Sequence, residues 1–541
     1  MRAALTLLCL LLALPVLGVL GAWLAADAAA WQVLAHQAQT VLPDYALQSA
    51  VLAGGVALGV MLLGSASAAA VTLFDFPGRR SFEWALLLPL AMPAYVLAYA
   101  WTDALQYSSP LQAALRQALG TRAALWPDVR SLWGAVVLFV LCLYPYVYLL
   151  ARTALGERAV QLMEAARLLG AGPRRRIVEV ALPLARPAIT AGVALALMET
   201  LADYGVGAYF GLTTFSTGIF KAWLVMNDGV AAAQLASVLL VVVALLLAAE
   251  RAAQRRLRFA ASRSGSAQAA DARPLPLRGG AALAAWALCA LPVLLGFVLP
   301  VGWLAWMLWQ EAHNAELCLP LARFAEWAWS SFRLAGTAAV LAAALALALA
   351  FAMRRRSGPL LNGAARVLSL GYAVPGAVVA IGILLPVGWL QQRWPGLPIG
   401  ATVTGTLLGV MYAYLARFSA VALQSVEAGY ARVSLSVDET ARMLGAGSWR
   451  LFAQLHAPLL RRSALAAALL VFVDVMKELP ATLVLRPFGS DTLAVVAFNF
   501  ARDERLGEAA LPSLAIVAVG LIPVMMLSRA LRGSPGRPPT A

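Results

Sequence analysis

The sequence predicts an all-α membrane protein in which two parallel six-helix repeats cross the bilayer in the same sense. Of the 541 residues, 62% are hydrophobic and only 12% are charged, and one loop motif recurs 275 residues further along the chain. A soluble globular chain carries about 25% charged residues. We therefore exclude a soluble or disordered protein and expect a duplicated chain that lies in a lipid bilayer.

About twelve apolar runs are long enough to cross a bilayer. A backbone exposed to lipid must satisfy its own hydrogen bonds, so each run is predicted to be a helix. The first run exceeds the apolar region of about 7–15 residues found in a signal peptide, so we expect it to be retained as a helix. The predicted spans are 4–26, 51–73, 84–102, 132–151, 184–203, 231–249, 281–308, 333–353, 367–390, 401–420, 462–478 and 511–530.

Basic residues in the loops predict the orientation, because they concentrate on the cytoplasmic side of a membrane. With the N-terminus inside, the inner loops contain the arginines of 79–80, 174–176 and 251–263, whereas the outer segment 27–50 has neither Lys nor Arg. The outer segment 103–131 fits less well because it has three arginines. We expect a multi-pass protein of the bacterial inner (plasma) membrane with both termini in the cytoplasm. The net charge of +15 comes mostly from such loops, and we expect no nucleic-acid partner.

A polar, arginine-rich segment, 251–280, is predicted to be a cytoplasmic linker between two halves. The first half is 1–250, with a core domain at about 51–250, and the second half is 281–541, with a core domain at about 332–531.

The duplication is clearest in the loop before the fifth span of each half. Each copy combines a Glu, small residues and two glycines, and a proline follows thirteen residues after the first glycine. We expect a short helix that ends at a glycine in the left-handed conformation, and then a second helix, which Ser448 caps in the second copy. The copies are Glu164-Ala-Ala-Arg-Leu-Leu-Gly170-Ala-Gly172 with Pro183, and Glu439-Thr-Ala-Arg-Met-Leu-Gly445-Ala-Gly447 with Pro458.

These loops resemble the EAA loop of importer-type (type I, MetI-like) ABC permeases, which forms a coupling helix in a cleft of the ATP-hydrolysing subunit. The second copy departs from the pattern, because Thr440 replaces the first Ala and Ala457 stands where Leu is expected. The residues to which the resemblance assigns ATPase coupling are Glu164, Ala165, Ala166, Gly170, Gly172, Glu439, Ala441, Gly445 and Gly447.

Longer strings are similar to the fused two-domain permeases of ferric iron importers. They include Phe76-Pro-Gly-Arg-Arg80, Ala202-Asp-Tyr-Gly205 and Asp474-Val-Met-Lys-Glu-Leu-Pro480. The resemblance implies a permease subunit that couples ATP hydrolysis to import, with two copies of an ATP-binding subunit and a periplasmic or extracellular solute-binding protein as partners. Thiamine and phosphonate permeases share the fused architecture, so thiamine, phosphonate or another small solute stays open as the cargo.

No residue pattern of an enzyme or a bound cofactor occurs in the sequence. It contains no P-loop, so the resemblance places ATP and Mg on the partner ATPase, and we expect neither catalysis nor a cofactor on this chain. The four cysteines form no CxxC pair and the three histidines are scattered, so no firm metal site is assigned. An ion-gradient-driven secondary transporter is a remote alternative that leaves the repeated loops unexplained.

Two pairs of acidic residues near the ends of the fifth and eleventh spans form a candidate substrate path: Glu199 with Asp203, and Asp474 with Glu478. Residues four apart share one helix face, and acidic residues within spans usually face a cavity or a partner. Carboxylates suit a hard trivalent cation. A purely structural role is the alternative, with Lys477 neutralising Asp474 and with Asp203 and Glu478 hydrated at the outer interface. We expect the loops 204–230 and 479–510 to form gates and a docking surface for the binding protein.

Overall fold

The computed structural model describes residues 2–23, 28–156, 166–172, 175–263, 274–314, 321–355 and 358–532. Within these residues the predicted all-α fold is confirmed, apart from one parallel pair of two-residue strands, β1 (Phe74–Asp75) and β2 (Leu275–Pro276). Eight of the described helices are long and apolar enough to cross a membrane, or ten if each of two bent pairs is one span.

The chain forms two packing units that are discontinuous in sequence. Unit 1 comprises Met1–Pro43, Phe215–Leu240 and Pro320–Asn499, and unit 2 comprises Asp44–Thr214, Val241–Leu319 and Phe500–Ala541. The sequence halves 1–250 and 281–541 describe the duplication, whereas the packing units exchange helices between those halves. One long helix, α13 (Gly229–Arg263), starts in unit 1, ends in unit 2 and enters the expected linker.

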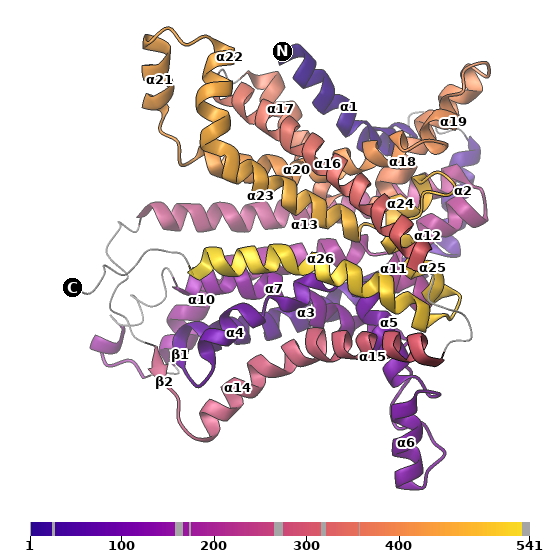
Figure 1. Cartoon of the computed structure of the whole chain (residues 1–541), viewed down its shortest axis with the longest axis vertical. Coiled ribbons are helices and arrows are strands. Elements are labelled where there is room, and N and C mark those ends of the chain that lie inside the picture. Colours follow the sequence, from indigo (N-terminus) through magenta and orange to yellow (C-terminus); the bar gives the residue numbers. More distant parts are fainter. Residues whose placement is uncertain are drawn as a thin grey trace. The chain divides into compact units, whose positions relative to one another are not determined.

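In unit 1, the N-terminal helix of the chain packs against helices of the second half. Figure 1 shows α1 beside α17 and α18, and α16, α20 and α23 pack against one another. The elements are α1 (Arg2–Gly21), α2 (Ala28–Gln39), α12 (Phe215–Phe220), η4 (Lys221–Val225), α16 (Leu321–Arg355), α17 (Pro359–Leu368), η6 (Gly371–Ala373), α18 (Gly376–Arg393), α19 (Ile399–Thr404), α20 (Leu408–Tyr430), α21 (Leu435–Met443), α22 (Ser448–Arg450), η7 (Leu451–His456), α23 (Ala457–Lys477), α24 (Pro480–Leu485) and α25 (Leu493–Arg502).

In unit 2, two segments of the second half cover the core of the first. Helix α15 packs against α5 and α26, and the indole of Trp303 donates to Asp103 Oδ2 at 2.8 Å. The elements are α3 (Leu42–Leu73), α4 (Arg79–Ala85), η1 (Leu88–Ala91), α5 (Ala94–Leu105), α6 (Pro110–Leu119), α7 (Leu132–Ala154), η3 (Arg176–Ala181), α10 (Leu182–Ala202), α11 (Gly205–Phe210), α14 (Gly280–Val293), η5 (Leu294–Val298), α15 (Leu299–Asn314) and α26 (Leu506–Arg532).

Ten of the twelve expected spans coincide with the apolar helices and bent pairs of the structure. The other two, 401–420 and 462–478, are occupied by α20 and α23, which are helical but are not among the ten. Helix α23 carries Arg461, Arg462, Asp474 and Lys477, which lower its hydropathy. Helix α20 contacts α16, α18 and α23, so protein rather than lipid covers much of its surface.

Two predicted spans, 84–102 and 367–390, are bent rather than straight. The chain turns by 91° between η1 and α5 and by 120° between η6 and α18. Pro93 and Pro375 stand at these breaks, and the residues before them, Met92 and Val374, have extended ψ angles of 112° and 125°. A proline disfavours the helical conformation of the residue that precedes it, so both copies bend at the corresponding point.

Close helix contacts depend on glycine. A Cβ atom on Gly192 of α10 would lie 2.6 Å from the Cα atom of Val147 on α7. In unit 1, a Cβ atom on Gly382 of α18 would lie 2.0 Å from the carbonyl oxygen of Pro15 on α1. Backbone atoms cannot move aside as a flexible side chain can, so these helices approach closely only because the side chain is missing.

We expect Gly192→Val to destabilise unit 2, because overpacking of a tight interior costs about 1–3 kcal/mol. Thermal unfolding of the purified chain, followed by size-exclusion chromatography, measures the effect. Gly302→Val on α15 is the matched control, because a Cβ atom there meets no atom within 4 Å. Equal midpoints for the two variants would contradict the close contact.

Candidate functional site

The two repeated loops share one backbone turn. Gly170 and Gly445 have left-handed φ angles of 81° and 79°, which confirms the predicted helix ends. In each copy, the residue after the glycine donates its N–H to the carbonyl oxygen five residues earlier: Ala171 to Ala166 at 2.9 Å and Ala446 to Ala441 at 3.0 Å. This pairing closes a helix C-terminus, so the duplication extends to backbone geometry.

The flanks of the turn follow the prediction in part. Glu164, Ala165 and Pro173 lie outside the described residues. The predicted cap at Ser448 is wrong, because Ser448 is the first residue of α22 and the extended Gly447 before it occupies the cap position. Each loop returns through one π-helical turn, η3 or η7, to a helix with proline in its first turn, as expected from Pro183 and Pro458.

A pair of large apolar side chains is exposed directly before each glycine. Leu168 and Leu169 are 84% and 88% exposed, and their counterparts Met443 and Leu444 are 88% and 82% exposed. Exposed apolar clusters mark interaction sites. The sequence analysis missed these four residues, although an apolar pair before the glycine in both polar loops was a visible signal.

The base of the second loop is anchored by Arg354 at the end of α16. Its Nε atom donates to Asp438 Oδ2 at 2.8 Å, and its Nη2 atom donates to the carbonyl oxygens of Val433 and Ser434, both at 2.9 Å. The Arg354 and Asp438 side chains are only 11% and 7% exposed. This anchor fixes α21 to a membrane-spanning helix.

His456 adds a neutral ring to the same anchor. Its Nε2 atom lies 3.4 Å from Asp438 Oδ1, and its ring packs against Phe351 and Tyr430. Burial lowers the pKa of His456, so Arg354 supplies the positive charge that faces Asp438 at neutral pH. The positions 275 residues before Asp438 and His456 are Met163 and Ala181 in the first copy. The two loops therefore share a turn but differ at the base.

Asp203 and Glu478 cap short helices at corresponding points of the two copies. Both residues interrupt a helix with extended ψ angles of 132° and 120°. The Asp203 carboxylate accepts the N–H of Val206 at 2.8 Å, and Glu478 Oε1 accepts the N–H of Ala481 at 2.9 Å. A carboxylate stabilises the N-terminus of a helix, so this role accounts for two of the four candidate carboxylates without a ligand.

Glu478 is held by a further ion pair. Arg417 Nη1 donates to Glu478 Oε1 at 3.0 Å, and the two side chains are 11% and 1% exposed. Thr482 donates its N–H to Glu478 Oε2 at 3.0 Å. Arg417 lies 61 residues before Glu478, and the sequence analysis missed it because a lone Arg in a predicted span does not show its partner.

Glu199 and Asp474 are half-buried on α10 and α23. Glu199 and Asp203 belong to unit 2, and Asp474 and Glu478 to unit 1. Among the described residues, no group of three or more His, Cys, Asp or Glu side chains is arranged to hold a metal ion. One carboxylate pair therefore lies in each unit. Of the four residues, only Glu199 and Asp474 lie within a long helix.

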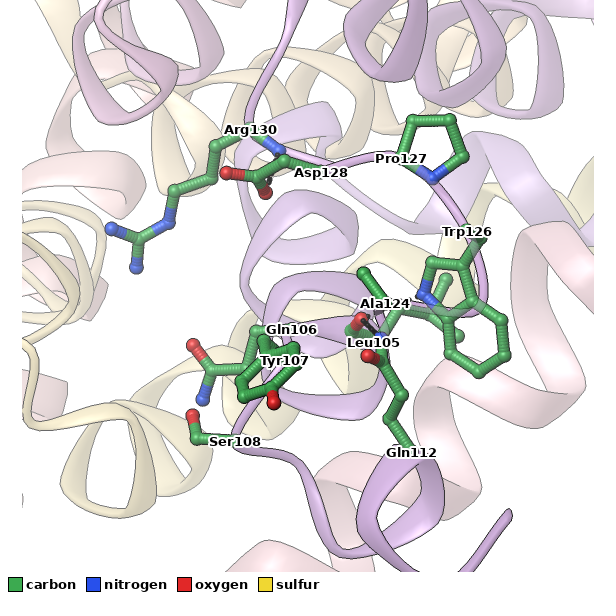
Figure 2. A pocket seen from close by; sticks show the side chains of 10 residues that line it. All are labelled: Leu105, Gln106, Tyr107, Ser108, Gln112, Ala124, Trp126, Pro127, Asp128 and Arg130. Atoms are coloured by element: carbon green, nitrogen blue, oxygen red, sulfur yellow. Dashed lines mark hydrogen bonds between the residues drawn. The ribbon is translucent and has the colours of Figure 1, made fainter. Parts of the chain in front are cut away.

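Unit 2 also has a cavity of about 360 Å³ in the segment 103–131. Figure 2 shows Trp126 and Gln112 on one side of it and Arg130 on another. The Trp126 indole and the Gln112 amide both donate to the carbonyl oxygen of Leu105, at 2.8 and 3.1 Å, so one backbone carbonyl holds both side chains.

Arg130 joins this segment to the loop that precedes α26. Its Nη1 atom donates to Glu504 Oε1 at 2.7 Å, and its Nη2 atom donates to the Tyr209 hydroxyl at 2.9 Å. The hydrogen bond from Arg130 lowers the pKa of Glu504. Two loops and helix α11 of unit 2 therefore meet at one guanidinium group.

The sequence is similar to those of known transport proteins. Residues 60–259 match the family model of the binding-protein-dependent transport system inner membrane component. The chain is 24% identical over 474 residues to the Fe(3+)-transport system permease protein FbpB 2 of Haemophilus influenzae, covering 88% of this chain and 87% of that protein.

Shorter similarities link the chain to phosphonate systems. It is 31% identical over 165 residues to the putative 2-aminoethylphosphonate transport system permease protein PhnV of Salmonella typhimurium, covering 30% of this chain and 58% of that protein. It is 26% identical over 186 residues to the corresponding protein PhnU of Salmonella choleraesuis, covering 34% of this chain and 65% of that protein.

We expect Asp438→Ala to loosen α21, because removal of one partner from a buried ion pair costs about 3–5 kcal/mol. Hydrogen exchange of the α21 amides measures the change, and exchange should become faster. Arg432→Ala, an exposed charge at the same turn, is the control and should leave the exchange unchanged. Unchanged exchange in the Asp438 variant would show that Arg354 does not anchor the loop.

Proposed function

We propose that this chain, which over residues 60–259 belongs to the family of binding-protein-dependent transport system inner membrane components, imports ferric iron. The chain is a multi-pass ABC importer permease of the inner membrane and not an enzyme. The observation that supports iron is the similarity to a Fe(3+)-transport permease over 88% of this chain, including both copies of the repeat.

In this proposal two copies of an ATP-binding subunit dock on the repeated loops. The exposed pairs Leu168–Leu169 and Met443–Leu444 would enter an apolar cleft on each copy. Both loops, and both termini, would then face the cytoplasm, in agreement with the arginine distribution. ATP and Mg would bind to the partner, and closure of the ATPase pair would move the loops. Such coupling requires that the two access states differ in their contacts with the ATPase.

The loop turn and the anchor support this mechanical role. A helix that ends in a left-handed glycine cannot extend, so α21 presents a fixed end to a partner. Arg354 connects α21 to α16, so displacement of the loop displaces a membrane-spanning helix. A solute-binding protein would deliver the cargo on the outer side, where the loops 204–230 and 479–510 are expected.

A phosphonate is the second candidate cargo, since permeases of 2-aminoethylphosphonate systems match 30% and 34% of this chain. A phosphonate is an anion, so it would need basic groups along its path rather than carboxylates.

Labelled ferric iron uptake by iron-limited cells, with and without this gene, tests the function. We expect loss of high-affinity uptake, restored by the wild-type chain but not by Gly170→Val with Gly445→Val, because left-handed backbone costs a non-glycine residue about 1–2 kcal/mol. Gly120→Val with Gly279→Val is the matched control, since both glycines have positive φ angles and open surroundings. Unchanged iron uptake without this gene would discard iron and direct the assay to 2-aminoethylphosphonate.

We expect Glu199→Gln with Asp474→Asn to lower iron uptake. Both carboxylates lie in long helices, and a cation that crosses the membrane needs negative charge along its path. Co-purification of the ATP-binding subunit should be unaffected. Glu326→Gln with Asp44→Asn, two exposed positions, serves as the charge-matched control. Wild-type transport in the first double variant would leave Glu199 and Asp474 with structural roles only.

A further inference from the structure

One aromatic side chain of unit 1 stands clear of the rest of the chain. Phe488, in the loop between α24 and α25, is 105% exposed, more than any other large apolar side chain of the described residues. Apolar surface in water is unfavourable, and full exposure leaves this ring without packing that would offset the cost. Aromatic rings dominate the energetics of protein interfaces, so the ring is available to a partner.

The loop holds the ring in a defined position. Ser490 donates its N–H to the carbonyl oxygen of Pro487 at 3.2 Å, and the left-handed φ of 77° at Gly489 is that of the third residue in a type II turn. Arg486 and Asp491, on either side of the turn, form an ion pair. The ring therefore stands at the tip of a braced turn, and little conformational freedom remains to be lost when a partner binds it.

This turn lies at the end of unit 1 that is opposite to the second repeated loop. Arg354 of α16 binds the repeated loop, whereas Ser331 of the same helix accepts the N–H of Leu493 at 2.8 Å. A helix rises about 1.5 Å per residue, so these two residues are about 35 Å apart along α16, enough to cross the apolar layer of a bilayer. Figure 1 shows α21 and α22 at one end of α23 and α24 at the other. With the repeated loops in the cytoplasm, as proposed above, Phe488 is on the outer side.

Protein rather than lipid encloses both arms of the turn. Helix α24 packs against α18 and α20, and its residues Ala481, Thr482 and Leu485 are buried. On the other arm, residues 492–498 are all buried. A ring that enters the bilayer needs a lipid-facing support, whereas this turn rises from between packed helices. A protein partner in the outer aqueous space is therefore favoured over a lipid.

The first copy has no counterpart of this ring. The position 275 residues before Phe488 is Thr213, whose N–H donates to Gln48 Oε1 at 3.0 Å. Thr213 is half-buried, so its loop is held against α3. A partner that binds Phe488 therefore distinguishes the second half of the permease from the first.

We propose that Phe488 is the apolar anchor by which the solute-binding protein recognises the second half of the permease. The family to which residues 60–259 belong depends on such a protein. The ring would enter an apolar pocket of the binding protein, and Arg486, Ser490 and Asp491 would form the polar rim around it, as at other protein interfaces. This inference rests on the proposed function for the orientation of the chain, but not on iron as the cargo.

The probe is the purified solute-binding protein whose deletion abolishes the uptake that requires this chain. Its Kd is measured for the full chain with its ATP-binding subunit in phospholipid nanodiscs. We expect Phe488→Ala to raise the Kd about tenfold, which corresponds to about 1.4 kcal/mol, and Phe488→Trp to keep the Kd within about twofold of the wild type. Leu360→Ala is the control, because Leu360 is 80% exposed but follows the Arg354 end of α16, and its Kd should not change.

A second variant tests the turn while the ring is kept. Gly489→Val introduces a side chain where the backbone is left-handed, although a Cβ atom there meets no atom within 4 Å. We expect it to raise the Kd, because the ring is no longer held in position. The double variant with Phe488→Ala should bind no more weakly than Phe488→Ala alone, because the turn acts through the ring.

Equal Kd values for the wild type and Phe488→Ala would overturn the proposal and leave the proposed function standing. A photoreactive phenylalanine analogue in place of Phe488 should crosslink to the binding protein, and crosslinking to phospholipid instead would also overturn the proposal. Iron uptake that persists without this gene would refute the cargo alone, because the Kd comparison uses whichever binding protein the uptake requires.

Discussion

The requirement that every backbone polar group be satisfied without water governs this protein. In a bilayer it forces the chain into helices, and wherever a helix stops, another group must accept or donate in its place. Asp203 and Glu478 do this for the short helices that follow them. The loop glycines close their helix ends with backbone bonds alone. The helix breaks and loop turns on which a transport cycle would depend are therefore the points where an acidic residue or a glycine completes the backbone hydrogen bonding.

The two copies differ in the charged residues at the loop and at the helix break. In the second copy, buried arginines hold both the loop and the helix break, through Arg354 with Asp438 and Arg417 with Glu478. Residues without charge stand at corresponding positions of the first copy, where Cys142 corresponds to Arg417 and Met163 to Asp438. Once one partner of a buried ion pair is present, loss of the other is costly. The described part of the second copy therefore depends on these buried pairs, although its motif departs further from the EAA pattern.

Because helices are exchanged between the halves, the packing of each unit depends on both halves of the chain. Unit 1 needs α1 from the first half, and unit 2 needs α15 and α26 from the second. Contacts such as Gly382 with Pro15, and Trp303 with Asp103, join residues hundreds of positions apart. Because the two halves are linked in one chain, the exchanged helices have a high effective concentration and pack within the same molecule.

The sequence by itself determined the features that depend on local or periodic constraints. Apolar length predicts the helices, a 275-residue repeat predicts the duplicated loops, and the absence of a Cβ atom predicts the left-handed turns at Gly170 and Gly445. Pro93 and Pro375 were an equally local signal of the two bends, which the lengths of the apolar runs do not show. Only the tertiary structure decided which helices pack together, that Arg354 and Arg417 find acidic partners, and that α1 crosses α18 in close contact. These features join distant residues through side-chain shape and charge, which helical periodicity does not encode.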